Sequence, residues 1–409
     1  MPRLPFLLAL VQVALAGGPA SLPAQDIDAA RLEAMRARDL RDAVVLFNLA
    51  ALRATSGDRE GTLALLAAVS QAPGGLDPGF YRGFAFLYRD TAFVRIVAGI
   101  RAANPPLVRG EPAFTIPERD LQPEGLAFDP VARALFAGSF KGKIVRIDSM
   151  GAVSDFVARA VPGAHRVVAG LRVDAVRRHL WAVVDDPRAF GDPAVGGAAL
   201  HQYALSDGQL LARHAGPPAG ALNDVALLPD GTACATGTSD GSVWCIRPGH
   251  GAMEPLVPGG TIPEANGITA TADGRAFYVA GWHDIHRVEY PSGRVRVLPA
   301  PAGAPTGSFD GLYRHGDGLV GIQNGIHPGR VVRLRLDPRG ERIVATEVLE
   351  RYHPRFNGMT TGAIDGDTFL YFANTQSRAF RPDGTAIDPA ALADIVILRL
   401  VLPPGGAAP

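Results

Sequence analysis

The segment PEGLAFDPVARALFAGS, residues 123–139, decides the fold, because its pattern returns five more times along the chain. In each copy a glycine or similar turn residue opens a short alternating strand, and a turn and a second strand follow. The other copies begin at residues 168, 222, 265, 309 and 360. The spacing between the two strands is constant in the first four copies, and the hairpin loop is two residues shorter in the last two. This regularity indicates an internal repeat.

The repeat predicts a β-propeller. Its copies recur at intervals of roughly 43 to 54 residues, and further strands follow each strand–turn–strand core, which is typical of propeller blades. Six copies predict a six-bladed propeller over residues 115–402, so the expected fold class is mainly β. The C-terminal segment DIVILRLVL, residues 394–402, is well placed to complete the last blade.

Residues 26–104 follow a helical pattern instead. The segment DAVVLFNLAALRATSGDREGTLALLAAVSQ, residues 42–71, has apolar residues at helical spacing and a break at Gly57–Asp58. It resembles a tetratricopeptide-type helix pair, and a further pair is expected between Tyr81 and Ala103. This small α-helical region either packs against the propeller or binds a protein partner. Residues 104–114 are expected to form a linker between the two parts.

The N-terminus has the pattern of a signal peptide, expected to cover residues 1–24. Arg3 precedes an apolar run, Leu4 to Ala16, and small residues follow, with Ala16, Ala20 and Ala24 as alternative cleavage positions. The run is too short to span a bilayer comfortably, so no stable membrane insertion is expected. The mature protein is expected to be periplasmic or secreted, and a buried first helix is the alternative.

Charge and cysteine content limit the classes of function further. Forty basic and forty acidic residues cancel, so no overall field favours nucleic acid as a partner. The two cysteines, Cys234 and Cys245, lie opposite each other if residues 238–241 form a hairpin loop. An oxidising compartment would permit a disulfide there, and two unpaired core cysteines are the alternative.

One register of the repeat carries the candidate chemistry. The position just before the glycine or aspartate of each copy holds, in order, Glu124, Ala169, Asn223, Asn266, Asp310 and Thr361. In a propeller the innermost strands start beside the central channel, so these side chains should ring one end of the axis. Any one Asn or Asp has an alternative explanation in turn chemistry. Four carboxylate or amide side chains in one register favour a metal site.

The expected ligand set contains two carboxylates and two amides, with neither histidine nor cysteine. Such oxygen ligands suit a hard divalent cation, and calcium fits the flexible geometry best. Magnesium is the nearer competitor, with manganese and zinc as further possibilities, although zinc usually recruits imidazole or thiolate.

The order PEG, LND, NGI and FDG over six repeats resembles the senescence-marker-protein, gluconolactonase and LRE-like hydrolases, over residues 115–402. The resemblance implies that Glu124, Asn223, Asn266 and Asp310 bind a catalytic divalent cation. It also implies that Asp310 acts as general base or nucleophile and that Asp224 supports the ring. The implied activity is hydrolysis of lactones or related esters.

Other candidate site residues are less specific. Thr361 either faces the substrate or packs in the channel. Trp282 and His283 follow the second strand of the fourth copy, and Gln323 and Asn324 lie in the segment GIQNGIHPG. These four residues either form the rim of a pocket or reflect ordinary loop polarity. No arginine can be assigned to a sugar-acid carboxylate, and no G-x-S-x-G elbow indicates a serine hydrolase. The alternative function is a non-enzymatic propeller with a structural metal and a helical protein-binding arm.

Overall fold

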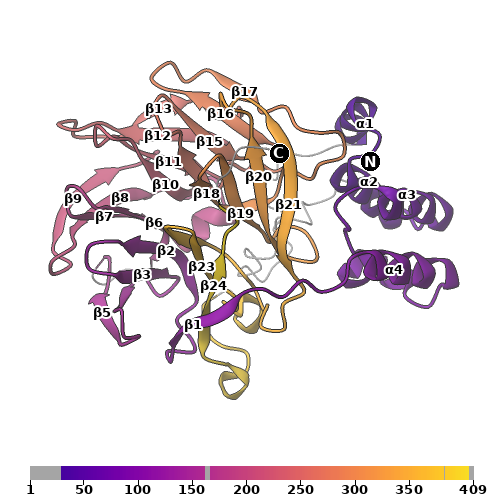
Figure 1. The fold of residues 1–409 in the computed structure, drawn as a ribbon, viewed down its shortest axis with the longest axis horizontal. Coiled ribbons are helices and arrows are strands. Elements are labelled where there is room, and N and C mark those ends of the chain that lie inside the picture. The colour runs from indigo at the N-terminus through magenta and orange to yellow at the C-terminus, as the bar shows by residue number, and fades with distance from the viewer. Residues whose placement is uncertain (1–28, 162–165, 382, 405–409) are drawn as a thin grey trace.

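A computed structural model describes residues 29–161, 166–381 and 383–404 of the 409-residue chain, so the expected signal peptide lies outside the described residues. The prediction of a six-bladed propeller is confirmed: six four-stranded antiparallel sheets are present (Figure 1). The first strands of successive repeats contact one another in a closed circle around the central axis. These innermost strands are β2, β6, β10, β14, β18 and β22.

Blades one to five are each built from four consecutive strands. Their bounds are β2 (Pro123–Asp129), β3 (Ala134–Ser139), β4 (Ile144–Ile147) and β5 (Val153–Val157) in blade one; β6 (Val167–Asp174), β7 (His179–Asp185), β8 (Ala199–Ala204) and β9 (Leu210–Ala215) in blade two; β10 (Leu222–Leu227), β11 (Ala233–Gly237), β12 (Ser242–Ile246) and β13 (Glu254–Val257) in blade three; β14 (Ile268–Ala270), β15 (Ala276–Ala280), β16 (Ile285–Glu289) and β17 (Val295–Val297) in blade four; and β18 (Phe309–His315), β19 (Gly318–Gln323), β20 (Arg330–Leu336) and β21 (Ile343–Arg351) in blade five.

Blade six closes the circle with strands from both ends of the propeller. It contains β22 (Gly362–Asp365), β23 (Thr368–Phe372) and β24 (Ile395–Val401), and β1 (Glu111–Ile116) pairs with β24 as its outermost strand. Residues 111–114, expected to be linker, therefore belong to a strand. The antiparallel pairing of Thr115 with Val396 covers an edge of β24 that would otherwise be unpaired.

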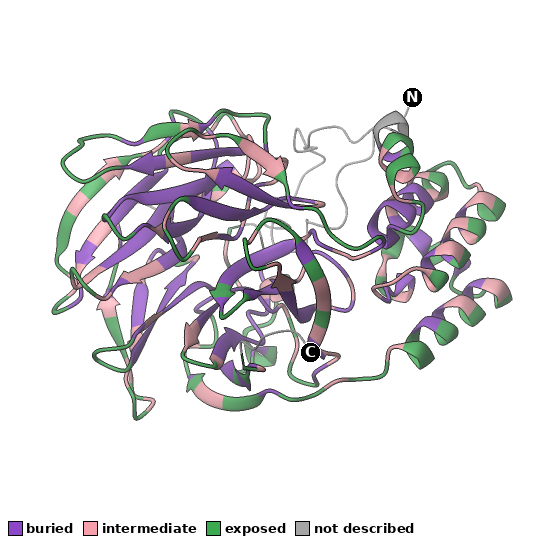
Figure 2. Cartoon of the chain, turned by 45° about the horizontal axis from the view of Figure 1, so that its top comes forward, coloured by how far each residue is buried: buried purple, intermediate pink, exposed green. Residues whose placement is uncertain are grey.

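The apolar core is divided into layers between neighbouring blades. One hydrophobic cluster fills each of the six blade-to-blade interfaces. Strands in the middle of a blade are covered on both faces, as Figure 2 shows, and all residues of β15 are buried. This explains why its sequence, AFYVA, is continuously apolar rather than alternating.

The N-terminal region forms α1 (Ala29–Arg38), α2 (Ala43–Thr55), α3 (Arg59–Gln71) and α4 (Thr91–Ala103). Aspartates cap three of these helices: Asp42, Asp58 and Asp90 each accept hydrogen bonds from backbone amides of the first turn. The Gly57–Asp58 break was correctly placed. In the expected second pair, only α4 is an α-helix, preceded by the 3-10 helices η1 (Pro78–Phe80) and η2 (Arg82–Leu87).

The helices pack on one side of the propeller (Figure 1). Ile326, in the loop between β19 and β20, belongs to the hydrophobic core of the helical region. Trp282, in the loop between β15 and β16, packs with Leu32, Val45 and Leu49. None of the described helices is long and apolar enough to cross a membrane.

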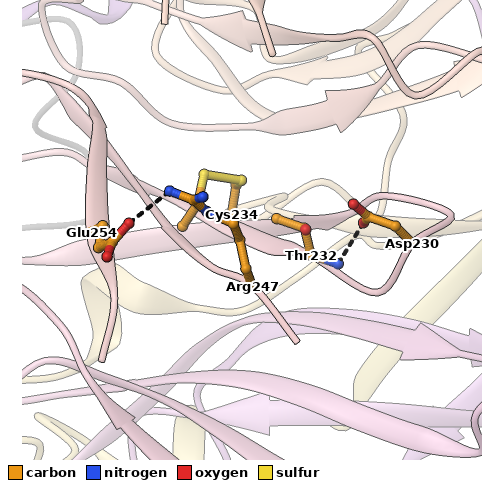
Figure 3. The surroundings of a disulfide bond; sticks show 6 residues. Asp230, Thr232, Cys234, Arg247 and Glu254 are labelled. Carbon is orange, nitrogen blue, oxygen red and sulfur yellow. Dashed lines mark hydrogen bonds and ion pairs between the residues drawn. A yellow bond between two sulfur atoms is a disulfide. The ribbon is translucent and has the colours of Figure 1, made fainter. Parts of the chain in front are cut away.

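The two cysteines form a disulfide. Cys234 in β11 lies directly opposite Cys245 in β12, and the loop between the strands covers residues 238–241 as expected. Figure 3 shows the bond beside the ion pair of Arg247 and Glu254. Both half-cystines lie in the apolar layer between blades three and four.

Candidate metal and active site

The ring residues lie where the pairing of the innermost strands is interrupted. Glu124, Ala169, Asn223 and Asp310 occur within β2, β6, β10 and β18, and in each of these strands the register with the second strand shifts at this position. Asn266 and Thr361 lie just before β14 and β22. A bulge leaves residues unpaired and redirects their side chains. The recurring irregularity is therefore the local feature that turns these side chains out of the sheet.

The glycine after the ring position lets neighbouring innermost strands touch. A Cβ on Gly125 would overlap the carbonyl oxygen of Ala169 in the next blade. A Cβ on Gly170 would lie 2.5 Å from the Cα of Asp224, and one on Gly267 would lie 2.6 Å from the backbone nitrogen of Leu312. Only glycine permits this approach. The repeated glycine thus brings the ring residues of successive blades close together.

Glu124 and Asp310 converge on one hydroxyl group. Thr360 Oγ1 lies 2.6 Å from Asp310 Oδ2 and 3.3 Å from Glu124 Oε2. Both acids are almost fully enclosed, with 6 % and 2 % of their surfaces exposed. The pKa of Glu124 is raised well above its usual value, first by burial and then by the negative charge of Asp310. Two buried carboxylates held in this way are costly unless a proton or a cation compensates their charge.

Asp224 is the third acid of this group. Its carboxylate accepts hydrogen bonds from the backbone amides of Val225 (2.8 Å) and Ile268 (3.1 Å), and Arg172 Nη2 lies 3.7 Å from its Oδ2. Burial raises the pKa of Asp224 to about 6, against the opposing influence of Arg172. Because its hydrogen bonds fix the start of β14, Asp224 supports the segment that follows Asn266.

Asn223 and Asn266 are the two amide residues of the predicted ligand set. Asn223 is 9 % exposed beside Asp224. Among the described residues, no hydrogen bond reaches the buried Oδ1 of Asn266, an oxygen that a cation would satisfy. The described part of the chain contains no cluster of three His, Cys, Asp or Glu side chains that could hold a metal. A cation at the ring therefore depends on the amide oxygens, and these residue types fit a hard divalent ion.

Three blades approach the ring through a left-handed backbone conformation. Gln122, Glu264 and Ser308 have φ values of 51°, 52° and 61°, and each lies two residues before a ring residue. This conformation is costly for residues other than glycine and persists where the surrounding structure imposes it. The backbone leading to Glu124, Asn266 and Asp310 is thus held in a defined, unfavourable geometry.

Thr361 and Gln323 hold the backbone around the ring. The Thr361 hydroxyl donates to the carbonyl of Glu124 across the junction of blades six and one. Gln323 is fully buried, donates to the carbonyls of Pro305 (3.0 Å) and Gly307 (2.8 Å), and accepts from Arg330 Nε (2.8 Å).

Trp282 and His283 face the helical region. Trp282 packs against α1 and α2, and His283 Nε2 lies 2.8 Å from Asp42 Oδ2 at the start of α2. Burial alone would lower the pKa of His283, but the carboxylates of Asp284 and Asp42 outweigh it and raise the pKa to about 10. These two residues therefore connect the helical region to blade four.

The helical region covers the ring end of blades four and five. In an antiparallel blade, the loop after the second strand lies at the end where the first strand begins. Contacts with the helical region come from such loops. The backbone amide of Asp77 donates to the carbonyl of His327 (2.9 Å), and the Phe80 ring lies tilted against the His327 ring, with the ring centroids 3.8 Å apart. Arg330, 1 % exposed, donates to the carbonyl of Gly74. The helices therefore form a wall beside the candidate site.

Three residues of the site were not singled out as such from the sequence. Thr360 precedes the ring register by one residue, and comparing that neighbouring register would have identified it. Asn324, considered only for a pocket rim, donates to Asp310 Oδ2 (2.6 Å) and to the carbonyl of Met359 (3.0 Å). Arg172 lies three residues after Ala169, one layer further along the channel, where no repeat pattern was compared.

No protein-family model and no curated protein matches the chain. Solved structures with similar folds include a gluconolactonase from Xanthomonas campestris, with 15% identity, 73% of this chain and 97% of that chain covered, and a TM-score of 0.49. A virginiamycin B lyase from Staphylococcus aureus has 14% identity, coverages of 69% and 81%, and a TM-score of 0.47. A chain of a nidogen/laminin complex has 15% identity, coverages of 64% and 95%, and a TM-score of 0.46. Similarity at this level does not identify a function.

Proposed function

We propose that the chain is a metal-dependent hydrolase of lactones or related esters, with a divalent cation bound by Glu124, Asn223, Asn266 and Asp310. The observation that carries this proposal is the meeting of the Glu124 and Asp310 carboxylates at the Thr360 hydroxyl. Buried carboxylates that repel each other are costly unless a positive charge compensates them. Calcium is the proposed ion, and magnesium, manganese and zinc are the alternatives that metal analysis would distinguish.

The protein groups around the ring have distinct proposed roles. Asp310 Oδ2 accepts hydrogen bonds from Thr360 and Asn324, which fix the rotation of the carboxylate. In this orientation Asp310 either takes a proton from the attacking water or attacks the acyl carbon itself. A bound divalent cation supplies Lewis-acid polarisation of the substrate oxygen and lowers the pKa of bound water. The helical wall restricts access over blades four and five.

We further propose that the protein acts in the periplasm or outside the cell. The disulfide between Cys234 and Cys245 supports this proposal, because such bonds persist in oxidising compartments. The apolar run at the N-terminus has the pattern of an export signal.

A non-enzymatic binding propeller is the second candidate, and one observation favours it. Phe80, Phe86, Tyr88 and Val94 of the helical region are each at least 40 % exposed. Exposed apolar side chains that form a contiguous patch are typical of protein-binding surfaces. In this alternative, the cation at the ring is structural and the helical region binds the partner.

The test is hydrolysis of a panel of lactones and aryl esters by the purified full-length mature protein. We expect activity that chelation removes and divalent ions restore, and its loss in Asp310→Asn without unfolding. Asp365→Asn is the matched control, because Asp365 lies at the opposite end of an innermost strand and pairs with Arg133. Full activity in Asp310→Asn would disprove the assigned role. A well-folded, metal-loaded protein that is inactive on the whole panel would favour the binding alternative.

A further inference from the structure

Arg172 lies across the central channel, one layer beyond the ring. Its Nε donates to the carbonyl of Val225 in blade three (3.0 Å), and its Nη2 reaches the carbonyl of Ile268 in blade four (3.4 Å). The guanidinium lies 5.4 Å from the centre of the Tyr313 ring in blade five. A single side chain from blade two therefore contacts three other blades near the axis.

The charge of this residue matters because of the acids beside it. Glu124, Asp224 and Asp310 are all buried near the axis. Arg172 Nη2 lies 3.7 Å from Asp224 Oδ2 and adds one permanent positive charge. The guanidinium is therefore a fixed positive charge that the chain itself places beside these acids.

The acceptors around the guanidinium are themselves hard oxygen ligands. They are the Asp224 carboxylate and the carbonyl oxygens of Val225 and Ile268. Carboxylate and backbone carbonyl oxygens are ligands that calcium commonly uses in proteins. Without the guanidinium, these three oxygens would face a position near the axis that lacks a cation.

A cavity opens on the side of Arg172 away from the ring. It has a volume of about 320 Å³, and its lining includes Phe128, Arg172, Thr269, Tyr313 and Asp365 from five blades. The cavity is large enough for several water molecules. Water and small ions can therefore reach the layer that the guanidinium occupies without passing through the ring.

We propose that Arg172 is a built-in cation that sets the metal stoichiometry of the ring to one divalent ion. The guanidinium occupies the position where Asp224 and the two carbonyls would otherwise hold a second cation. This inference rests on the proposed function, because it assumes that the ring binds a divalent ion. Arg172 therefore acts by excluding a second cation, and we assign it no contact with the substrate.

The test compares calcium binding by the full-length mature protein and three variants, using equilibrium dialysis with elemental analysis. Arg172→Met and Arg172→Gln remove the charge, and Gln keeps a hydrogen-bond donor that favours folding. Arg172→Lys keeps the charge. We expect one calcium ion per chain in the wild type and in Arg172→Lys, and two in both neutral variants. Calcium should also raise the melting temperature of the neutral variants more than that of the wild type. If Arg172 had only a structural role, calcium would not restore the stability of these variants in this way.

The outcomes separate this inference from the proposed function. One calcium ion in the wild type and one in a folded Arg172→Gln, with unchanged affinity, would overturn the role of Arg172 and leave the ring site intact. A wild-type chain that binds no divalent ion would overturn the proposed function itself, together with this inference.

Discussion

The carboxylates of Glu124 and Asp310, from the first and fifth blades, lie on either side of one threonine hydroxyl. Thr360 Oγ1 is 3.3 Å from Glu124 Oε2 and 2.6 Å from Asp310 Oδ2. Neither acid could reach this point if the blade repeat did not return the innermost strand to the axis. The relationship places two like charges in a largely buried position, and its energetic consequences are testable.

Asp310→Asn should stabilise the metal-free protein and remove its response to calcium. The substitution removes one of two repelling charges, for which a gain of about 1 kcal/mol in the free energy of unfolding is reasonable. In the wild type, calcium at 100 times its Kd should add about 2.7 kcal/mol. Thermal unfolding with and without calcium measures both effects, and Asp365→Asn is the control. A variant less stable than the metal-free wild type, yet still stabilised by calcium, would contradict this account.

Gly170→Ala should weaken the propeller, because the new Cβ would lie 2.5 Å from the Cα of Asp224 in the next blade. Overpacking of this kind typically costs about 1–3 kcal/mol. Gly99→Ala in α4 is the matched control, because a Cβ there meets no atom within 4 Å. It should stabilise the protein by up to about 1 kcal/mol. Urea unfolding compares the two, and equal effects would refute the close approach of the innermost strands.

The ion pair between His283 and Asp42 should make stability depend on pH above neutrality. The pKa of His283 is raised to about 10 in the folded protein, and is about 6.5 in an unfolded chain. The contribution of His283 to the free energy of unfolding is therefore fully present below pH 6.5 and is lost as the pH rises towards 10. The loss should not exceed about 1.4 kcal/mol per pH unit.

Urea unfolding at pH 6.5, 8 and 9.5 measures this loss. In Asp42→Asn the slope should be reduced, while the side chain remains able to cap α2 by accepting from Val44 and Val45. His283→Gln should remove the contribution of this group. An unchanged slope in both variants would show that His283 does not stabilise the docking of the helices.

The disulfide should be detectable without any structure determination. Thiol labelling of the unfolded, unreduced protein should modify neither Cys234 nor Cys245. Replacing both by alanine should cost about 2–3 kcal/mol, as expected for a short closed loop. Labelling of both thiols in protein isolated from an oxidising compartment would contradict the bond.

The repeat made the propeller predictable from the sequence, and the ring of four metal ligands stays a prediction. Tertiary contacts determine the features that the repeat did not reveal. The glycine after Glu124, Ala169, Asn266 and Thr361 fixes the register in which residues must be compared. The pairing of β1 with β24 joins residues 279 to 288 positions apart in the chain, and nothing in EPAFTI distinguishes an outer strand from a linker. The residue pattern within a short segment does not specify which distant strand the segment pairs with.

Single side chains outside the ring register were harder to place. For Trp282 and His283 the sequence left open a pocket rim or ordinary loop polarity. The structure adds that they contact α1 and α2, which only the docking of the helices determines. Arg172 occurs in an ordinary-looking strand, LRVD, and its position at the axis follows from the next layer of the repeat. Comparing every inward-facing layer, rather than one, would have revealed it.

The most direct measurement is the anomalous X-ray signal from crystals of the protein soaked in manganese or a lanthanide, collected at the absorption edge of the ion. The account predicts one peak at the ring end of the channel, within bonding distance of side-chain oxygens from Glu124, Asn223, Asn266 and Asp310. A well-ordered crystal with no peak there, or with these four oxygens directed away from a common point, would contradict it.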